Sequence, residues 1–291
     1  MYTFQEFLDD RTFSAFLTQN SQFVAQLMRK LNETALSTIH KNIVICALPK
    51  SASTFIANVL NETIPSRRVN LSFAFNNVVS DHRLYFPNII FWKLNGGHTI
   101  SQHHMVAGYE TARLVERYDL KLIVTTRNIL DALISLRDDI NRRIKNGSFN
   151  YRGLGFVTYL PEFFEKKFKE ADLEAQNNMV IDYFAEWYFK FILSWKEFSD
   201  SKSHPVLTIS YEKFIENNMA AFNLILKFLA LEDYEPHICT AMEKIMADRQ
   251  RSNFNKGETG RGLVSFHPYQ IEKIKQIGSY FADTVTIKNL L

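Results

Sequence analysis

The sequence predicts an α/β fold in which helices flank a central parallel sheet. Three apolar runs, residues 43–48, 120–126 and 205–212, have the length of buried strands. Between them lie segments whose apolar residues recur every three or four positions, which is typical of amphipathic helices. Because strands that alternate with helices usually form βαβ units, we expect the strands to be parallel.

The first half of the chain contains most of the predicted sheet. Residues 4–36 have a helical pattern with a break near residues 20–21, so we expect residues 1–40 to form helices packed on the core. The run Ile43–Leu48 has no charged or strongly polar residue, which suits a parallel strand buried on both faces. The elements predicted next are a helix over 52–62, a strand over 88–94, a helix over 104–118, a strand over 120–126 and a helix over 127–144.

The helix over 127–144 has a recognisable start. Asn128 is a favourable N-cap, and Asp131 three positions later completes a capping-box arrangement. In the second half we expect a loop over 146–160, a helix over 179–199, a strand over 205–212, helices over 214–231 and 236–248, a glycine-rich loop over 253–266 and a final helix from residue 267. No repeat or linker divides the chain, so a single domain over 1–291 is predicted.

Composition excludes several classes of protein. The 34 Lys and Arg nearly balance the 31 Asp and Glu, which argues against a nucleic-acid-binding surface. No run approaches the 18–20 apolar residues of a membrane span, and the acidic first residues do not resemble a signal peptide. Two cysteines, Cys46 and Cys239, make no disulfide framework. A cytoplasmic protein is therefore expected, and its oligomeric state is left open.

The first apolar strand leads into the segment PKSAST, residues 49–54, and then into a helix. The start of a helix has unpaired N–H groups and partial positive charge, which attract anions. Lys50 adds a full charge, and Ser51, Ser53 and Thr54 add hydroxyl donors. The two glycines of the pattern G-x-x-x-x-G-K-[ST] are missing. The segment is either an anion cradle or an ordinary strand-to-helix turn with Ser51 as N-cap.

Two later segments could bind further anions. Arg127 follows the strand over 120–126, and Ser135 lies two helical turns further on, at the edge where open α/β sheets bind ligands. A guanidinium suits phosphate, although Arg127 could instead pair with Asp131 on the helix surface. The segment FNKGETGRG, residues 254–262, has three glycines and two basic residues. It is either another anion-binding loop or a flexible surface loop.

Together these motifs resemble those of the sulfotransferase family, which uses 3′-phosphoadenosine-5′-phosphosulfate (PAPS). PKSASTF is similar to the family's P-K-S-G-T-T-W loop for the 5′-phosphosulfate, and TRNILDALIS to its R-N-x-x-D-x-x-x-S segment for the 3′-phosphate. NKGETGRG is similar to the late R-K-G-x-x-G loop. The motifs agree in order and spacing over about residues 43–280. The resemblance implies a P-loop NTPase-like sulfotransferase architecture, with PAPS as co-substrate and no metal.

The resemblance also implies site residues. Lys50 would be catalytic, because it would stabilise the charge on the departing phosphate. Arg127 and Ser135 would bind the 3′-phosphate, which ATP lacks. The cofactor-binding residues implied are Ser51, Ala52, Ser53, Thr54, Phe55, Arg127, Ser135, Lys256, Gly257 and Arg261.

Three positions depart from the family pattern. Ala52 replaces the usual glycine, which matters chiefly if φ is positive there. Phe55 replaces the usual tryptophan and would pack on adenine in its place. Asn255 stands where an arginine is common, so Arg251 or Arg261 would supply that charge.

The reaction needs a base that takes a proton from the acceptor, and histidine suits neutral pH. The segment GGHTISQHHM offers His98, His103 and His104. The resemblance favours His104 as the catalytic base and places His103 second; the alternative for each is a surface or helix-capping role. Residues 141–178 are a candidate lid or acceptor wall.

The sequence thus predicts a sulfotransferase that moves the sulfuryl group from PAPS to a hydroxyl or amine of a small-molecule or glycan acceptor, by direct in-line transfer. Two alternatives stay open. One is a P-loop kinase or other NTPase, which would need Mg²⁺, and the other is a relative that binds the nucleotide without catalysis. The acceptor is not identified by the sequence, because acceptor pockets lie on variable loops.

Overall fold

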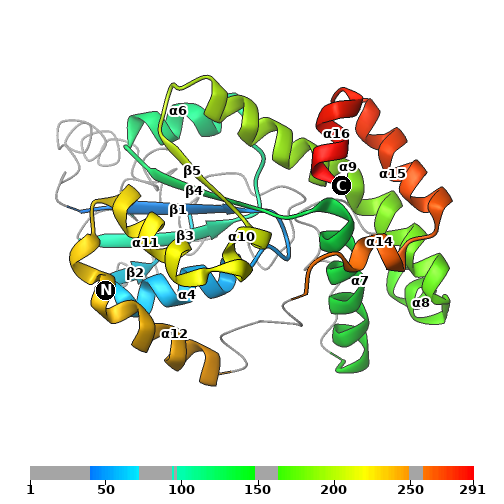
Figure 1. Cartoon of the computed structure of the whole chain (residues 1–291), viewed down its shortest axis with the longest axis horizontal. Helices are drawn as coiled ribbons and strands as arrows, with labels where there is room; N and C mark the ends of the chain where they lie inside the picture. The colour runs from blue at the N-terminus through cyan, green and yellow to red at the C-terminus, as the bar shows by residue number, and fades with distance from the viewer. Residues whose placement is uncertain (1–39, 72–93, 95–96, 148–162, 249–257) are drawn as a thin grey trace, which may run out of the picture.

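The computed structural model describes residues 40–71, 94, 97–147, 163–248 and 258–291. The predicted N-terminal helices and residues 88–93 of the predicted strand over 88–94 lie outside the described residues. Within them, the predicted parallel sheet is confirmed. Five strands lie in the order β2-β3-β1-β4-β5, and every neighbouring pair is parallel (Figure 1).

Three of the strands lie within two residues of their predicted bounds: β1 Asn42–Ala47, β4 Lys121–Thr126 and β5 Val206–Ser210. The other two, β2 Ser66–Arg68 and β3 His98–His103, were not predicted. The sequence of β3 is HTISQH, and Ile100 is its only apolar residue. It is nevertheless an inner strand, and its Thr, Ser and Gln side chains find hydrogen-bond partners there; Thr99 Oγ1, for example, donates to Asn42 Oδ1 over 2.8 Å. An apolar run is therefore not required for this buried strand.

Helices cover both faces of the sheet, and the side chains of β1 alternate between them. Ile43 and Ile45 belong to one core, with α4 Ser53–Thr63, α10 Tyr211–Glu216, α11 Asn218–Leu229, the 3-10 helix η3 Glu232–His237 and α12 Ile238–Ala247. Val44 and Cys46 belong to the other, with α6 Tyr109–Arg117, α7 Ile129–Lys145, α8 Phe164–Glu170, α9 Leu173–Asp200, α15 Pro268–Ser279 and α16 Thr284–Leu290. Burial on both faces explains why β1 is apolar throughout.

Several predicted helices begin elsewhere than expected. The helix predicted over 104–118 is the shorter α6, which begins at Tyr109 after the N-cap Gly108. The helix predicted from 179 begins six residues earlier, where Asp172 caps α9 through its side chain. The predicted loop over 253–266 contains a short helix, α14 Arg261–Ser265, which packs against α7.

The candidate lid over 141–178 is described in part. Its described residues form the end of α7, the helix α8 and the start of α9. Phe164 and Phe168 of α8 are fully buried in the core beside α9. Residues 148–162 of the segment lie outside the described residues. Phe164 and Phe168 therefore belong to the core, and a lid role for the segment stays a prediction.

All five strands of a parallel sheet end at the same edge, and this fixes the position of the candidate site. The end of β1 leads to Lys50, the end of β3 to His104 and the end of β4 to Arg127. Because β1 lies between β3 and β4, these three strand ends are immediate neighbours. The topology thus brings together residues that are up to 77 positions apart in the chain.

Candidate active site

The loop after β1 has a backbone conformation that few residues other than glycine adopt. Lys50 and Ala52 have φ angles of 70° and 64°, which cost an L-residue about 1–2 kcal/mol each. The Ser51 hydroxyl fastens the loop, 2.5 Å from the Leu48 carbonyl oxygen and 2.7 Å from the Thr125 hydroxyl. The N-cap of α4 is Ala52, so the simple capping role for Ser51 is wrong. Strained backbone of this kind is concentrated at ligand-binding sites.

The first turn of α4 presents hydroxyl groups that a residue of β3 orients. Gln102 Nε2 donates to Ser53 Oγ over 2.9 Å and to Thr54 Oγ1 over 3.2 Å. Because both oxygens accept, their hydrogens point away from Gln102 and can serve as donors to another group. With the N–H groups and positive dipole at the start of α4, they suit an anion. Sequence reasoning missed Gln102, since it lies in the unpredicted strand.

Phe55 lies under this loop, and its ring is covered. The residue is 1% exposed and packs against Phe214 and Phe222, at ring-centre distances of 6.1 and 6.4 Å. It thus belongs to the core on the α4 side of the sheet. The predicted contact with adenine stays a prediction, and it requires this ring to be uncovered.

Arg127 joins the loop after β1 to the late glycine-rich loop. Its Nη1 donates to the Lys50 carbonyl oxygen and its Nη2 to the Glu258 carbonyl oxygen, both over 3.0 Å. The guanidinium carbon lies 3.9 Å from the centre of the Tyr211 ring, and burial lowers the pKa of the arginine. Its Nε is buried and has no hydrogen-bond partner in the described structure. A buried, undersatisfied donor of this kind suits an anionic ligand.

Asp131 is not the partner of Arg127 among the described ion pairs, because it holds the late loop instead. Its carboxylate accepts the backbone N–H groups of Gly260 and Gly262, each over 2.7 Å. The predicted capping box is therefore only half formed. Asn128 accepts from the Asp131 N–H as predicted, whereas the Asp131 side chain is used by the loop.

Arg261 begins α14 and is paired. It lies 2.5 Å from Asp138 and 3.5 Å from Glu258, with a side chain that is 18% exposed. The structure therefore places Arg261 beside α7, between the two glycines that Asp131 holds. The predicted site residues Lys256 and Gly257 lie outside the described residues, as do Arg251 and Asn255.

Ser135 and a tyrosine that sequence reasoning missed lie deeper in the site. Ser135 is on α7 and is 3% exposed. Tyr188 of α9 is fully buried, and its hydroxyl has no hydrogen-bond partner in the described structure. Burial raises the pKa of Tyr188 strongly, and the charges of Arg127 and Asp139 also act on it. The sequence showed only an aromatic helix here, so nothing distinguished Tyr188 from its core neighbours.

The structure separates the three candidate histidines. His98 begins β3, at the opposite edge of the sheet from Lys50, and its Nδ1 accepts from the Lys41 N–H over 2.9 Å. His103 ends β3 opposite Cys46 and is 1% exposed. His104 follows at the carboxyl edge. The position of His98 is therefore incompatible with a role beside Lys50.

His104 has a defined tautomer. Its Nδ1 lies 2.8 Å from the Ala47 carbonyl oxygen. Since a carbonyl can only accept, Nδ1 carries the hydrogen and Nε2 carries the lone pair. Burial lowers the pKa of His104 to about 4, and the nearby Lys50 charge adds to this. The imidazole is thus neutral at pH 7, as a general base must be.

The Lys50 ammonium lies along α7. Its Nζ is 3.6 Å from Asp139 Oδ1, and the two side chains are 16% and 4% exposed. Burial lowers the pKa of Lys50, Asp139 opposes this, and Arg142 and Arg143 add to the lowering. A buried ammonium at a strand-to-helix loop, near a neutral imidazole, can stabilise a developing negative charge.

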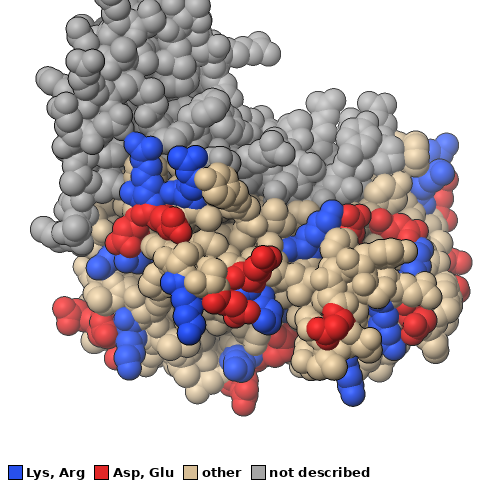
Figure 2. Space-filling view, turned by 90° about the horizontal axis from the view of Figure 1, so that it is seen from above, with Lys and Arg blue, Asp and Glu red and all other residues tan. Residues whose placement is uncertain are grey.

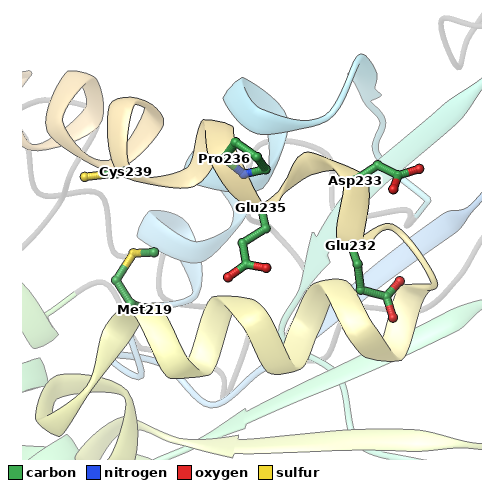
Figure 3. Close-up of a pocket in the computed structure, with 6 residues that line it drawn as sticks. All are labelled: Met219, Glu232, Asp233, Glu235, Pro236 and Cys239. Atoms are coloured by element: carbon green, nitrogen blue, oxygen red, sulfur yellow. The ribbon is translucent and has the colours of Figure 1, made fainter.

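Other parts of the described surface differ from this site. Lys and Arg are interspersed with Asp and Glu on the face shown in Figure 2, so no single-sign surface covers its described part. A pocket between α11, η3 and α12 is lined by Met219, Glu232, Asp233, Glu235, Pro236 and Cys239 (Figure 3). None of the predicted site residues line it. Cys46 and Cys239 are not disulfide-bonded, and Cys46 is buried as expected.

Neither a metal cluster nor a membrane-spanning helix occurs in the described part of the chain. No group of three or more His, Cys, Asp or Glu side chains among the described residues has a geometry that could hold a metal ion. No helix among the same residues is long and apolar enough to cross a bilayer.

The parallel sheet and the contact between the segments at Lys50 and Arg127 define an α/β protein with a candidate anion-binding site, and comparisons specify the family. The family model described as "Sulfotransferase domain" matches residues 40–277. No curated protein matches the chain. Since the family model covers most of its length, the chain belongs to the sulfotransferase domain family.

A solved structure from mouse agrees with this fold. The chain is similar to mouse sulfotransferase SULT7A1 complexed with PAP, at a TM-score of 0.55 and 17% identity over 88% of this chain and 90% of that chain. It is also similar to a sulfotransferase from Alicyclobacillus acidocaldarius, at a TM-score of 0.45 and 13% identity over 86% of this chain and 95% of that chain.

Proposed function

We propose that this chain transfers a sulfuryl group from PAPS to a hydroxyl or amine of a small-molecule acceptor. Family membership favours sulfuryl transfer over the kinase or NTPase alternatives. The observation that carries the proposal is the hydrogen bond from Arg127 Nη1 to the Lys50 carbonyl oxygen, because it joins the two predicted anion-binding segments in one site. The mouse structure to which the chain is similar contains PAP, which supports the same class of nucleotide here.

Each end of the nucleotide has residues that fit it. The strained loop after β1 and the oriented hydroxyls of Ser53 and Thr54 would hold the 5′-phosphosulfate. Arg127 and Ser135 would bind the 3′-phosphate, and the undersatisfied Nε of Arg127 supports this role. Lys256, Gly257 and Arg261 remain part of the proposed nucleotide site.

The proposed chemistry uses Lys50 and His104. His104 Nε2 takes the proton from the acceptor hydroxyl while the acceptor oxygen attacks sulfur and the sulfur–oxygen bond to the phosphate breaks. Lys50 stabilises the negative charge that builds on the departing phosphate. The Ala47 carbonyl supports this arrangement, because it fixes the tautomer in which Nε2 is the basic nitrogen.

The first experiment tests the nucleotide. Adenosine 3′,5′-bisphosphate is added without metal, and ATP with Mg²⁺ is added in parallel, while thermal unfolding is followed. We expect the bisphosphate to raise the melting temperature strongly, because only bound nucleotide stabilises the folded state. ATP with Mg²⁺ should do little, since it lacks the 3′-phosphate. The reverse ranking would favour a kinase or NTPase.

The second experiment tests the chemistry. Transfer from labelled PAPS is measured with a panel of phenols, alcohols, amines and short glycans, in the presence of EDTA. Lys50→Ala and His104→Ala should each lower kcat by at least about 100-fold, the usual scale for losing a charge stabiliser or a base. Lys196→Ala, at an exposed surface pair, is the matched control. Unchanged transfer in both site variants would refute the assigned roles.

We also infer a reducing, cytoplasmic setting. The support for it is that the two cysteines are unpaired, with Cys46 buried and Cys239 exposed.

A further inference from the structure

Lys50 has an ion-pair partner for which the proposed chemistry gives no role. Asp139 lies on α7, twelve residues after Arg127, and its carboxylate reaches back to the Lys50 ammonium over 3.6 Å. Both side chains are mostly buried, at 16% and 4% exposure. Charges removed from water interact more strongly than surface pairs do, so this contact must affect the behaviour of Lys50.

The two partners of this ion pair are not equivalent. Asp139 also pairs with Arg142, and its Oδ2 lies 2.9 Å from Arg143 Nε, both from the next turn of α7. Among the described residues, Asp139 is the one carboxylate that pairs with Lys50. If Lys50 moved away, Asp139 would keep two cations from its own helix. The pair can therefore open without leaving a buried carboxylate uncompensated.

Among the described residues, further charged and titratable groups lie near Lys50, and Arg127 after β4 donates to the Lys50 carbonyl oxygen. Arg142 and Arg143 of α7 repel its positive charge, and His104, which follows β3, also lies within range of that charge. Tyr188 of α9 is close enough to Asp139 for the two groups to interact. Asp139 is thus the group in this set that favours a charged Lys50 in the empty site.

From this geometry we propose that Asp139 is a positioning residue, which holds the Lys50 ammonium in the empty site and releases it to the sulfuryl donor. This role rests on the proposed function. Asp139 is paired with the ammonium that the phosphosulfate would contact, so an arriving phosphosulfate competes with it. The arginines make this exchange possible, because they remain on the carboxylate after Lys50 has left.

Replacing Asp139 by Asn should have two effects of opposite sign. The competing carboxylate is lost, so the nucleotide should bind more tightly wherever Lys50 stays protonated. The group that kept Lys50 charged is also lost, while burial and the two arginines remain. Lys50 should therefore lose its proton at a lower pH, and nucleotide affinity should begin to fall at a lower pH than in the wild type.

The test measures binding of adenosine 3′,5′-bisphosphate by calorimetry between pH 6.5 and 9.5. Four full-length proteins are compared: wild type, Asp139→Asn, Asp139→Glu and Asp200→Asn. Asp200 forms an exposed pair with Lys196 on α9 and is the matched control for removing a carboxylate. Asp139→Glu retains the charge. Asp139→Ser provides the same comparison should Asp139→Asn not fold.

At pH 6.5 we expect Asp139→Asn to bind the bisphosphate at least about threefold more tightly than the wild type does. As the pH rises, its affinity should begin to fall at a lower pH than that of the wild type. Asp139→Glu and Asp200→Asn should follow the wild type at every pH. A purely structural role of Asp139 would not move the pH profile. Equal affinity to the wild type at every pH, or weaker binding at pH 6.5, would overturn the positioning role. If neither the wild type nor Asp200→Asn binds the bisphosphate, the proposed function is wrong, and the positioning role that rests on it is wrong as well.

Discussion

The substitution Gly262→Ala tests how the late loop is fixed to α7. A methyl group at this position would lie 2.5 Å from the carbonyl carbon of Leu130 and 2.8 Å from the backbone nitrogen of Asp131. Real Cβ atoms essentially never approach other atoms to less than 3.0 Å. Since these neighbours are backbone of a long buried helix, α14 must move instead.

The magnitude follows from the contacts that this movement breaks. The carboxylate of Asp131 would lose its hydrogen bonds to the Gly260 and Gly262 N–H groups. Asp131 is 2% exposed, and hydrogen bonds to charged groups contribute about 1.5–3 kcal/mol each. With partial relaxation, we expect a loss of about 3 kcal/mol in the free energy of unfolding. Displacement of Arg261 and of the Glu258 carbonyl should also weaken bisphosphate binding about tenfold.

Urea unfolding measures the stability and calorimetry the binding. Gly147→Ala is the control, because a methyl group added there would meet nothing within 4 Å; Gly147 follows α7 and has a φ of 63°. Gly147→Ala should lower the free energy of unfolding by about 1 kcal/mol, because alanine is strained in the left-handed conformation. The reasoning is refuted if Gly262→Ala is no more destabilising than Gly147→Ala, or if it leaves nucleotide affinity unchanged.

Two further predictions concern stability. Phe55→Leu should lower the free energy of unfolding by about 1 kcal/mol, measured in urea, because the ring packs in the core; a large loss of bisphosphate affinity at unchanged stability would instead put the ring on the nucleotide. His104 has a pKa lowered from 6.5 to about 4. As the pH falls below 6.5, His104 takes up a proton in the unfolded chain but stays neutral in the folded protein. The free energy of unfolding therefore decreases until about pH 4, where the folded protein also binds the proton. Urea unfolding at pH 7 and pH 4.5 should show a loss of up to about 3 kcal/mol in the wild type that is missing in His104→Asn. An equal loss in both proteins would show that His104 is not the source.

The inner strands β1 and β4 were predictable because a strand buried on both faces must be apolar. The edge strand β5 is only partly buried, but it also contains a short run of apolar residues. β3 broke this rule, because its Thr, Ser and Gln side chains find partners on neighbouring elements. Gln102, for example, is satisfied by hydroxyls of α4, 48 and 49 residues away in sequence. Such compensation is invisible to any local pattern.

The candidate site was predictable to a similar extent. The segment around Lys50 and the strand end at Arg127 carry recognisable residues, and the structure brings them into contact. The choice among three histidines could not be made in the same way, because it depends on which edge of the sheet each one reaches. His98 and His104 are six residues apart, yet a strand between them places them at opposite edges.

The amino-acid sequence by itself determined the class of fold and the family resemblance, and it predicted anion binding by the segments at Lys50 and Arg127. These features depend on neighbouring residues and on the order of motifs along the chain. Only the tertiary structure decided that Asp131 holds the late loop, that Asp139 pairs with Lys50 and that Ala47 fixes the tautomer of His104. Each of these contacts joins different elements of the chain, and packing of the whole fold determines which side chains meet there.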